Sequence, residues 1–164
     1  MARHTRYQGL IIKDHKILLI QHSQNSTGRS FWVILGGGLD GSETEEECDI
    51  RVMKEETNFD VKTDRLVFDE PAYPVGVYKW RKSFICIPIV GEASPGFEPE
   101  PEAAADYSIT AVKWFDLRSD SEWGDEIKDD TYTYPQLMKL RNVPVQRILD
   151  TRADSFMETF RLVD

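Results

Sequence analysis

An acidic segment between residues 43 and 56 holds the side chains whose types and spacing best suit chemistry. Glu55 and Glu56 are adjacent, and Asp49 lies about one helical turn before Val52. In a helix with about 3.6 residues per turn these carboxylates fall on one arc. Carboxylates on one arc repel one another unless a cation lies among them, and such oxygen ligands suit Mg²⁺ or Mn²⁺. The segment therefore predicts a divalent-metal site.

Three consecutive glycines, Gly36, Gly37 and Gly38, precede the acidic segment. Glycine lets the backbone approach a metal or a phosphate where a side chain would obstruct it. We expect this bend to lie beside the carboxylates and to contact the substrate. Arg51 points off the acidic arc and could pair with Glu43, which would tie the loop to the helix.

The region from Gly37 to Phe59 resembles the Nudix box, Gly-x5-Glu-x7-Arg-Glu-U-x-Glu-Glu-x-Gly-U, where U is a bulky apolar residue. The matching positions are Gly37, Glu43, Arg51, Met53, Glu55, Glu56 and Phe59. The resemblance implies a hydrolase that uses Mg²⁺ or Mn²⁺ to split a diphosphate linkage by attack of water on phosphorus. It further implies metal ligation by Glu56 and the Gly37 carbonyl, with Glu55 as a second ligand or as the group that orients water.

Two positions depart from the box. Val52 stands where the family has the first glutamate of the Arg-Glu-x-x-Glu-Glu run, and valine is neither a ligand nor a base. Asp49 could compensate in part as a further metal ligand. Remote acids resembling those that the family takes from a later loop are an alternative: Glu98, Glu100, Glu102 and Asp106. Asn58 replaces glycine, which is a mild change because asparagine tolerates the left-handed conformation at a helix end.

Basic residues outside the box are candidates for neutralising substrate phosphates. Arg29, Arg81 and Lys82 are the three that we single out, and solvated surface charge is their alternative role. The three histidines, His4, His15 and His22, show no ligand spacing and receive no role.

Composition limits the classes of partner. The formal net charge of −9 argues against a nucleic-acid polymer or an anionic membrane as partner. No apolar run approaches the ~18–20 residues that a membrane span needs. Cys48 and Cys86 have no partner at metal-binding spacing, which predicts two reduced, buried thiols. Together with the absence of a signal-peptide pattern, these features predict a cytoplasmic protein.

The pattern of elements is α+β. Strands are predicted over 7–13 and 16–22, joined by a turn at Asp14-His15, and over 31–35, which the glycines break. A helix over 44–57, with Thr44 and Glu47 as a capping box, ends at Asn58. Further strands are predicted over 61–69, 73–80, 83–90 and 109–117, and a short helix over 135–141. With the resemblance, this indicates a Nudix-like α/β/α sandwich with a mixed β-sheet and the box helix packed against it.

We expect a hydrolase domain over residues 1–142 and a C-terminal helix over 143–164 that packs on the domain or on a second copy in a homodimer. The leading function is hydrolysis of a nucleoside diphosphate derivative, such as ADP-ribose, or of a nucleoside triphosphate. The alternative, motivated by Val52, is a Nudix-fold protein that binds or senses a nucleotide with weak turnover.

Overall fold

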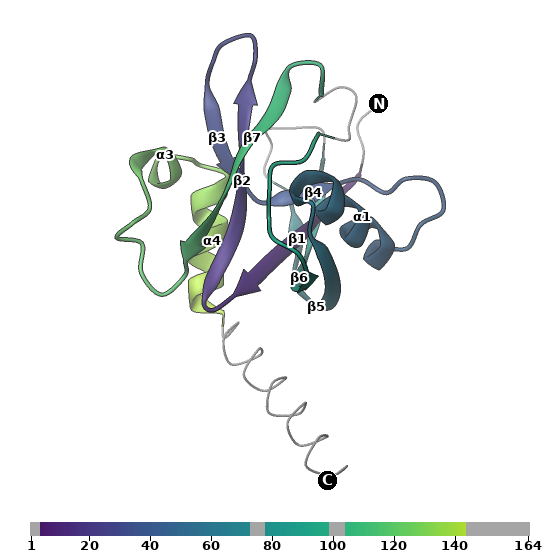
Figure 1. The fold of residues 1–164 in the computed structure, drawn as a ribbon. Coiled ribbons are helices and arrows are strands. Elements are labelled where there is room, and N and C mark those ends of the chain that lie inside the picture. Colours follow the sequence, from purple (N-terminus) through teal and green to yellow (C-terminus); the bar gives the residue numbers. More distant parts are fainter. Residues whose placement is uncertain (1–3, 73–77, 99–103, 144–164) are drawn as a thin grey trace, which may run out of the picture.

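The computed structural model describes residues 4–72, 78–98 and 104–143. Within these ranges the chain forms one mixed sheet flanked by helices (Figure 1). The strands are β1 (Thr5–Lys13), β2 (Lys16–Gln24), β3 (Ser30–Val33), β4 (Leu35–Gly37), β5 (Asp60–Pro71), β6 (Trp80–Val90) and β7 (Tyr107–Asp116). The helices are α1 (Glu45–Thr57), α3 (Asp125–Lys128) and α4 (Thr133–Asn142).

The sheet has the strand order β3-β2-β1-β6-β5, with β4 paired to β1 and β7 paired to β2. β1 and β6 run parallel, from Thr5 opposite Trp80 to Ile11 opposite Cys86, whereas the other pairs are antiparallel. Helices cover both faces, and β1 accordingly carries an unbroken buried run from Tyr7 to Ile12. The α+β class and the mixed sheet predicted from the sequence are confirmed.

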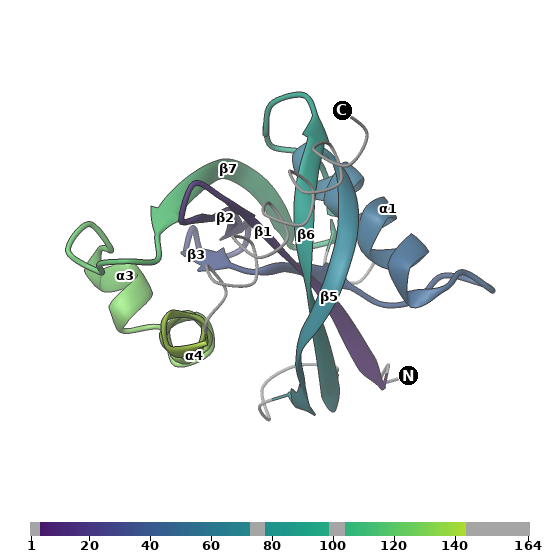
Figure 2. The same ribbon diagram turned by 90° about the horizontal axis from the view of Figure 1, so that it is seen from below.

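Two hydrophobic cores lie on opposite faces of the sheet. Because side chains alternate along a strand, Leu10 and Ile12 of β1 pack with α4, whereas Ile11 packs with α1. Figure 2 shows α1 and α4 on opposite sides of β5 and β6. The box helix is therefore one outer layer of the predicted α/β/α sandwich.

Local signals fixed the ends of α1 as predicted. The Thr44 hydroxyl accepts a hydrogen bond from the Glu47 N–H, and the Glu47 carboxylate accepts one from the Thr44 N–H. Asn58 ends the helix in the left-handed conformation, with φ of 62°. The hairpin turn also agrees, since Asp14 and His15 have φ of 52° and 65°, as a two-residue primed turn requires.

Some strand boundaries differ from the prediction. The strand expected over 31–35 is divided into β3 and β4, and the glycines extend β4 to Gly37 instead of ending it, because Gly36 and Gly37 pair with β1. The strand expected over 61–69 continues to Pro71. Most of the strand expected over 73–80 and nearly all of the helix expected over 143–164 fall outside the described residues.

Candidate metal centre

Glu56 is the carboxylate of α1 that points toward β4, the short strand that contains Gly36 and Gly37 (the glycine strand). Its side chain is buried, and its Oε1 atom accepts a hydrogen bond of 3.1 Å from the Gly36 N–H. A Cβ at Gly36 would lie 2.8 Å from the Tyr7 carbonyl oxygen. Any larger residue at position 36 would therefore clash with β1. Glycine lets β4 pair closely with β1 while the Gly36 N–H faces Glu56.

Residues 94–98 dock against the C-terminal end of α1. The backbone N–H groups of Ser94, Gly96 and Phe97 donate hydrogen bonds of 2.9 Å to the carbonyls of Thr57, Glu56 and Glu55, in that order. The last carbonyls of a helix have no partner within the helix, and this segment supplies one. A Cβ at Gly96 would lie 1.9 Å from the Glu55 carbonyl oxygen, so the close approach requires glycine.

Asn58 fastens the same segment through its side chain. Its Nδ2 donates to the Ser94 hydroxyl at 2.8 Å and faces the Ser94 and Pro95 carbonyls at 3.3 and 3.4 Å. The residue that replaces the glycine of the box thus both adopts the left-handed conformation and clamps the loop. The consequence is that Glu98, one residue beyond Phe97, comes to lie beside Glu56.

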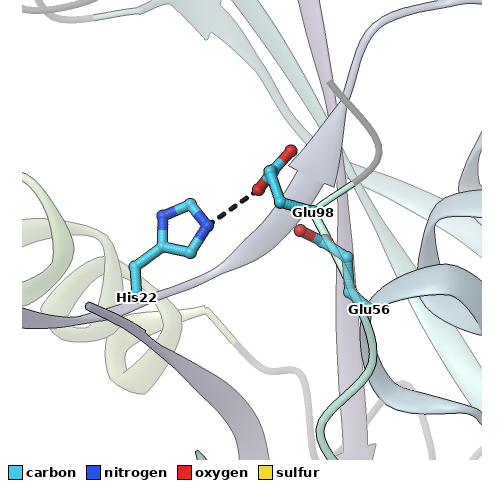
Figure 3. A group of neighbouring side chains, drawn as sticks. All are labelled: His22, Glu56 and Glu98. Carbon is cyan, nitrogen blue, oxygen red and sulfur yellow. Dashed lines mark hydrogen bonds and ion pairs between the residues drawn. The ribbon is translucent and has the colours of Figure 1, made fainter. Parts of the chain in front are cut away.

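His22 completes a group of three with Glu56 and Glu98. Its Nε2 lies 2.7 Å from Glu98 Oε2, and one potential ligand atom from each of the three residues lies within 4.8 Å of the others. Figure 3 shows the side chains converging from β2, α1 and the segment before residue 99. Two carboxylates and one imidazole fit a divalent metal ion. Within the described part of the chain this is the one such group.

The position of His22 was not predicted from the sequence. Side chains alternate along β2, so His22 lies on the same face as Leu18 and Ile20, which pack toward α1. The His22 ring stacks on Tyr107 of β7, with centroids 5.3 Å apart. No motif marks a lone histidine in a strand, because its partners lie 34 and 76 residues further along the chain. The sequence analysis assigned His22 no role, whereas the structure places it beside Glu56 and Glu98.

Arg51 joins the glycine loop to the helix, as the sequence predicted. Its Nη2 lies 2.7 Å from Glu43 Oε1 and 3.0 Å from the Gly38 carbonyl oxygen. Its Nη1 donates to Glu55 Oε2 at 3.0 Å. The hydrogen bond from Arg51 is the main cause that lowers the pKa of Glu43. Glu55 is thereby oriented by Arg51 and lies outside the group of three.

Asp49 lies on the buried face of α1 but in a different environment. Both carboxylate oxygens are buried and have no hydrogen-bond partner among the described residues. Burial, followed by the charge of Glu45, raises its pKa to about 8. Seven residues separate Asp49 from Glu56, which is about 10 Å along a helix axis. Asp49 and Glu56 share one face of α1, as the predicted arc requires, but Asp49 does not belong to the group of three, and its role as a metal ligand stays a prediction.

Val52, between these two acids, is fully buried in the core beneath α1. It packs with apolar residues such as Met53 and Leu35. The position that carries a glutamate in the box thus contributes only packing.

The remaining predicted residues are spread over the molecule. Gly37 ends β4 opposite Tyr7, with its neighbours Gly36 and Gly38 in the contacts described above. Arg29 is exposed, with its guanidinium 5.3 Å from the centre of the Phe31 ring. Arg81 is buried and donates to Glu70 at 3.1 Å, so the structure offers no support for its predicted role in phosphate binding. Lys82 pairs with Glu45 at 3.0 Å.

Two acids of the later loop, Glu100 and Glu102, lie outside the described residues. Asp106 accepts hydrogen bonds from Gln24 and Ser26, which lower its pKa, and is not part of the group. Of the predicted remote acids that the structure describes, Glu98 alone reaches Glu56. Cys48 and Cys86 are buried free thiols, as predicted.

The fold and this group define a mixed-sheet domain with two carboxylates and an imidazole gathered at the end of its box helix. The chain belongs to the Nudix family, whose NUDIX domain matches residues 3–133. Two curated relatives are the NAD-capped RNA hydrolases NudC of Vibrio atlanticus, 33% identical over 65% of this chain, and of Photobacterium profundum, 32% identical over 56%. These matches span 35% and 33% of the relatives' own lengths.

Solved structures share the fold. The E. coli ORF135 protein has a TM-score of 0.61 at 15% identity, covering 90% of this chain and 94% of that one. An ADP-ribose pyrophosphatase from Streptococcus suis has a TM-score of 0.53 at 21% identity, covering 70% and 75%. Among the residues described here, no helix is both long and apolar enough to cross a lipid bilayer.

Proposed function

We propose that this chain is a metal-dependent hydrolase that splits the diphosphate linkage of a nucleoside diphosphate derivative. The observation that carries the proposal is the convergence of Glu56 and Glu98 beside the Gly36 N–H, in a chain of the Nudix family. Water adds to one phosphorus, the bridging P–O bond breaks, and two phosphate monoesters leave. A bound Mg²⁺ or Mn²⁺ would polarise the phosphate oxygens and lower the pKa of a bound water.

The chain's own residues have separate tasks in this proposal. The carboxylates of Glu56 and Glu98 hold the cation, and the Gly37 carbonyl remains a predicted further ligand. Glu55 is oriented by Arg51 and accepts the proton of the attacking water or aligns that water. Glu43 fixes Arg51 from the other side, so that the glycine loop and the helix keep one geometry. Gly36 and Gly38 lie at the same bend and are the predicted contacts for the substrate's phosphates.

The substrate class follows from the relatives by analogy. One relative is named for NAD-capped RNA and one structural neighbour for ADP-ribose, and both molecules carry a nucleoside diphosphate linked to a second group. We propose a small nucleoside diphosphate derivative of this kind as substrate. The net charge of −9 is the argument against the RNA part of a capped polymer.

The test is hydrolysis by metal-stripped protein supplied with Mg²⁺ or Mn²⁺. ADP-ribose, NAD, nucleoside triphosphates and NAD-capped RNA form the panel, and products are separated by chromatography. In ¹⁸O-labelled water, one of the two product phosphates is expected to carry the label. Absence of product from every substrate with both metals would overturn the proposal. Turnover of capped RNA in preference to free NAD would overturn the assignment of a small substrate.

A second candidate is a nucleotide-binding protein with little turnover, and the buried Val52 favours it. Without the first glutamate of the run, the box lacks one of its carboxylates. Calorimetric binding of ADP-ribose without product formation would support this candidate.

A further inference from the structure

We propose that His22 is a nitrogen ligand of the metal site and gives it a preference for Mn²⁺ and similar transition metals over Mg²⁺. This inference rests on the proposed function, because it concerns the ion of the same site. The imidazole then supplies a donor where Val52 leaves the box one carboxylate short.

The distances suit a single ion. Metal–ligand bonds of about 2.0–2.2 Å place neighbouring ligand atoms about 3 Å apart and opposite ones about 4.2 Å apart. His22 Nε2 lies 2.7 Å from Glu98 Oε2, and the ligand atoms of all three residues lie within 4.8 Å. One ion can therefore contact the three side chains with only small movements.

The group is built into the fold, unlike an ordinary surface ion pair. The side chains of His22 and Glu98 are 20% and 6% exposed, and Glu56 is 1% exposed. Two nearly buried carboxylates and an imidazole therefore offer a cation three ligand atoms within reach of one another. Figure 3 shows the Glu98 carboxylate between the His22 ring and the Glu56 carboxylate, and the ligand atoms of all three lie within 4.8 Å of one another.

The histidine is held in place from two directions. His22 continues the face of β2 on which Leu18 and Ile20 pack toward α1, and the ring of Tyr107 stacks against it. Metal-binding imidazoles depend on such support for their orientation. Imidazole nitrogen favours first-row transition metals, whereas Mg²⁺ prefers oxygen ligands throughout. The donor set therefore sets the metal preference.

Pulsed electron paramagnetic resonance of Mn²⁺ bound to the full chain tests the proposal directly. Direct coordination by histidine produces a ¹⁴N modulation in the spectrum, and selective ¹⁵N labelling of histidine must replace it with a ¹⁵N modulation. The labelling experiment needs no variant and so does not depend on whether a variant folds. We expect the modulation in the wild type and in His4→Gln, and its loss in His22→Gln.

Calorimetry with the same proteins gives the metal preference. His22→Gln is expected to lower the Mn²⁺ affinity about tenfold or more and the Mg²⁺ affinity less than threefold, with His4→Gln unchanged in both. Bound Mn²⁺ without nitrogen modulation, or modulation that persists in His22→Gln, would overturn the role of His22. If the role of His22 is overturned but the wild type hydrolyses substrate and Glu56→Gln does not, the proposed function still holds. Wild-type protein that binds neither metal would overturn both.

Discussion

Asp49 and Glu56 are two buried carboxylates on the same face of the same helix, yet their surroundings differ completely. Glu56 accepts a hydrogen bond from Gly36 and lies beside Glu98 and His22. Asp49 faces the apolar core, has no hydrogen-bond partner among the described residues, and has a pKa raised to about 8. An acidic side chain on the buried face of a helix is therefore not enough to predict a metal site, because the residues around it decide.

The partners that distinguish these two acids come from other parts of the chain. Glu56 lies at the end of α1, where the glycine strand, β2 and residues 94–98 meet. Asp49 lies two turns earlier, where the sheet presents side chains such as Cys86, whose pKa is raised by burial and by the charge of Asp49. We therefore expect Glu56 to take part in metal binding, and we expect the buried charge of Asp49 to reduce the stability of the fold.

The largest expected effect is that of Glu56→Gln. The amide keeps the size of the side chain but loses the charge that holds a cation, so kcat/KM for diphosphate hydrolysis should fall about 10³-fold. Glu46→Gln, on the exposed side of the same helix, is the matched control and should retain wild-type activity. A variant at residue 56 with more than a tenth of the wild-type rate would remove the distinction between the two acids.

Glu98→Gln should come next, with a loss of about 10²-fold in kcat/KM with Mn²⁺. The loss is smaller because Glu56 and His22 remain to hold the ion. Glu92→Gln, an exposed acid in the same connection between β6 and β7, serves as its control. Equal activity of the two variants would show that the proximity of Glu98 to Glu56 has no chemical consequence.

Asp49→Asn should change stability. The unfolded Asp49 ionises near pH 4 and the folded one near pH 8, so the free energy of unfolding should fall as pH rises between these values and stay flat above. The variant should lack this fall and be about 2 kcal/mol more stable than the wild type at pH 8, because a buried amide without partners keeps part of the cost. Urea unfolding at pH 5 and 8 measures both.

The metal affinity of the same variant decides between the two roles considered for Asp49. Retained Mn²⁺ affinity agrees with its distance from Glu56. A tenfold or greater loss would return Asp49 to the metal site and contradict the comparison made above.

The smallest expected effect is that of Asn58→Gly. Glycine keeps the left-handed helix end without strain but removes the side-chain clamp on Ser94. Glu98 should be held less firmly, and kcat/KM should fall about three- to tenfold. Limited proteolysis of the 94–98 segment checks the cause. Unchanged kinetics would show that the backbone hydrogen bonds from Ser94, Gly96 and Phe97 hold the loop alone.

Predictions from the sequence held where the determining contacts are local. The capping box, the left-handed Asn58 and the Asp14-His15 turn each depend on residues within a few positions of one another. The pair of Arg51 with Glu43 spans eight residues and was also predicted, since the helix fixes the direction of Arg51. Strand ends were less accurate, because β4 ends where its pairing with β1 ends.

The sequence by itself determined the family, the acidic helix with its ends, and Glu56 as the expected ligand, because a box of fixed spacing on one helix needs no distant partner. Only the tertiary structure decided that His22 and Glu98 join Glu56 and that Asp49 does not. His22 and Glu98 are separated by 76 residues, and the face of β2 that packs toward α1 and a docked loop bring them together. Whether side chains so far apart in the sequence meet depends on how the strands, helix and loop pack together, and this cannot be read from a local sequence pattern.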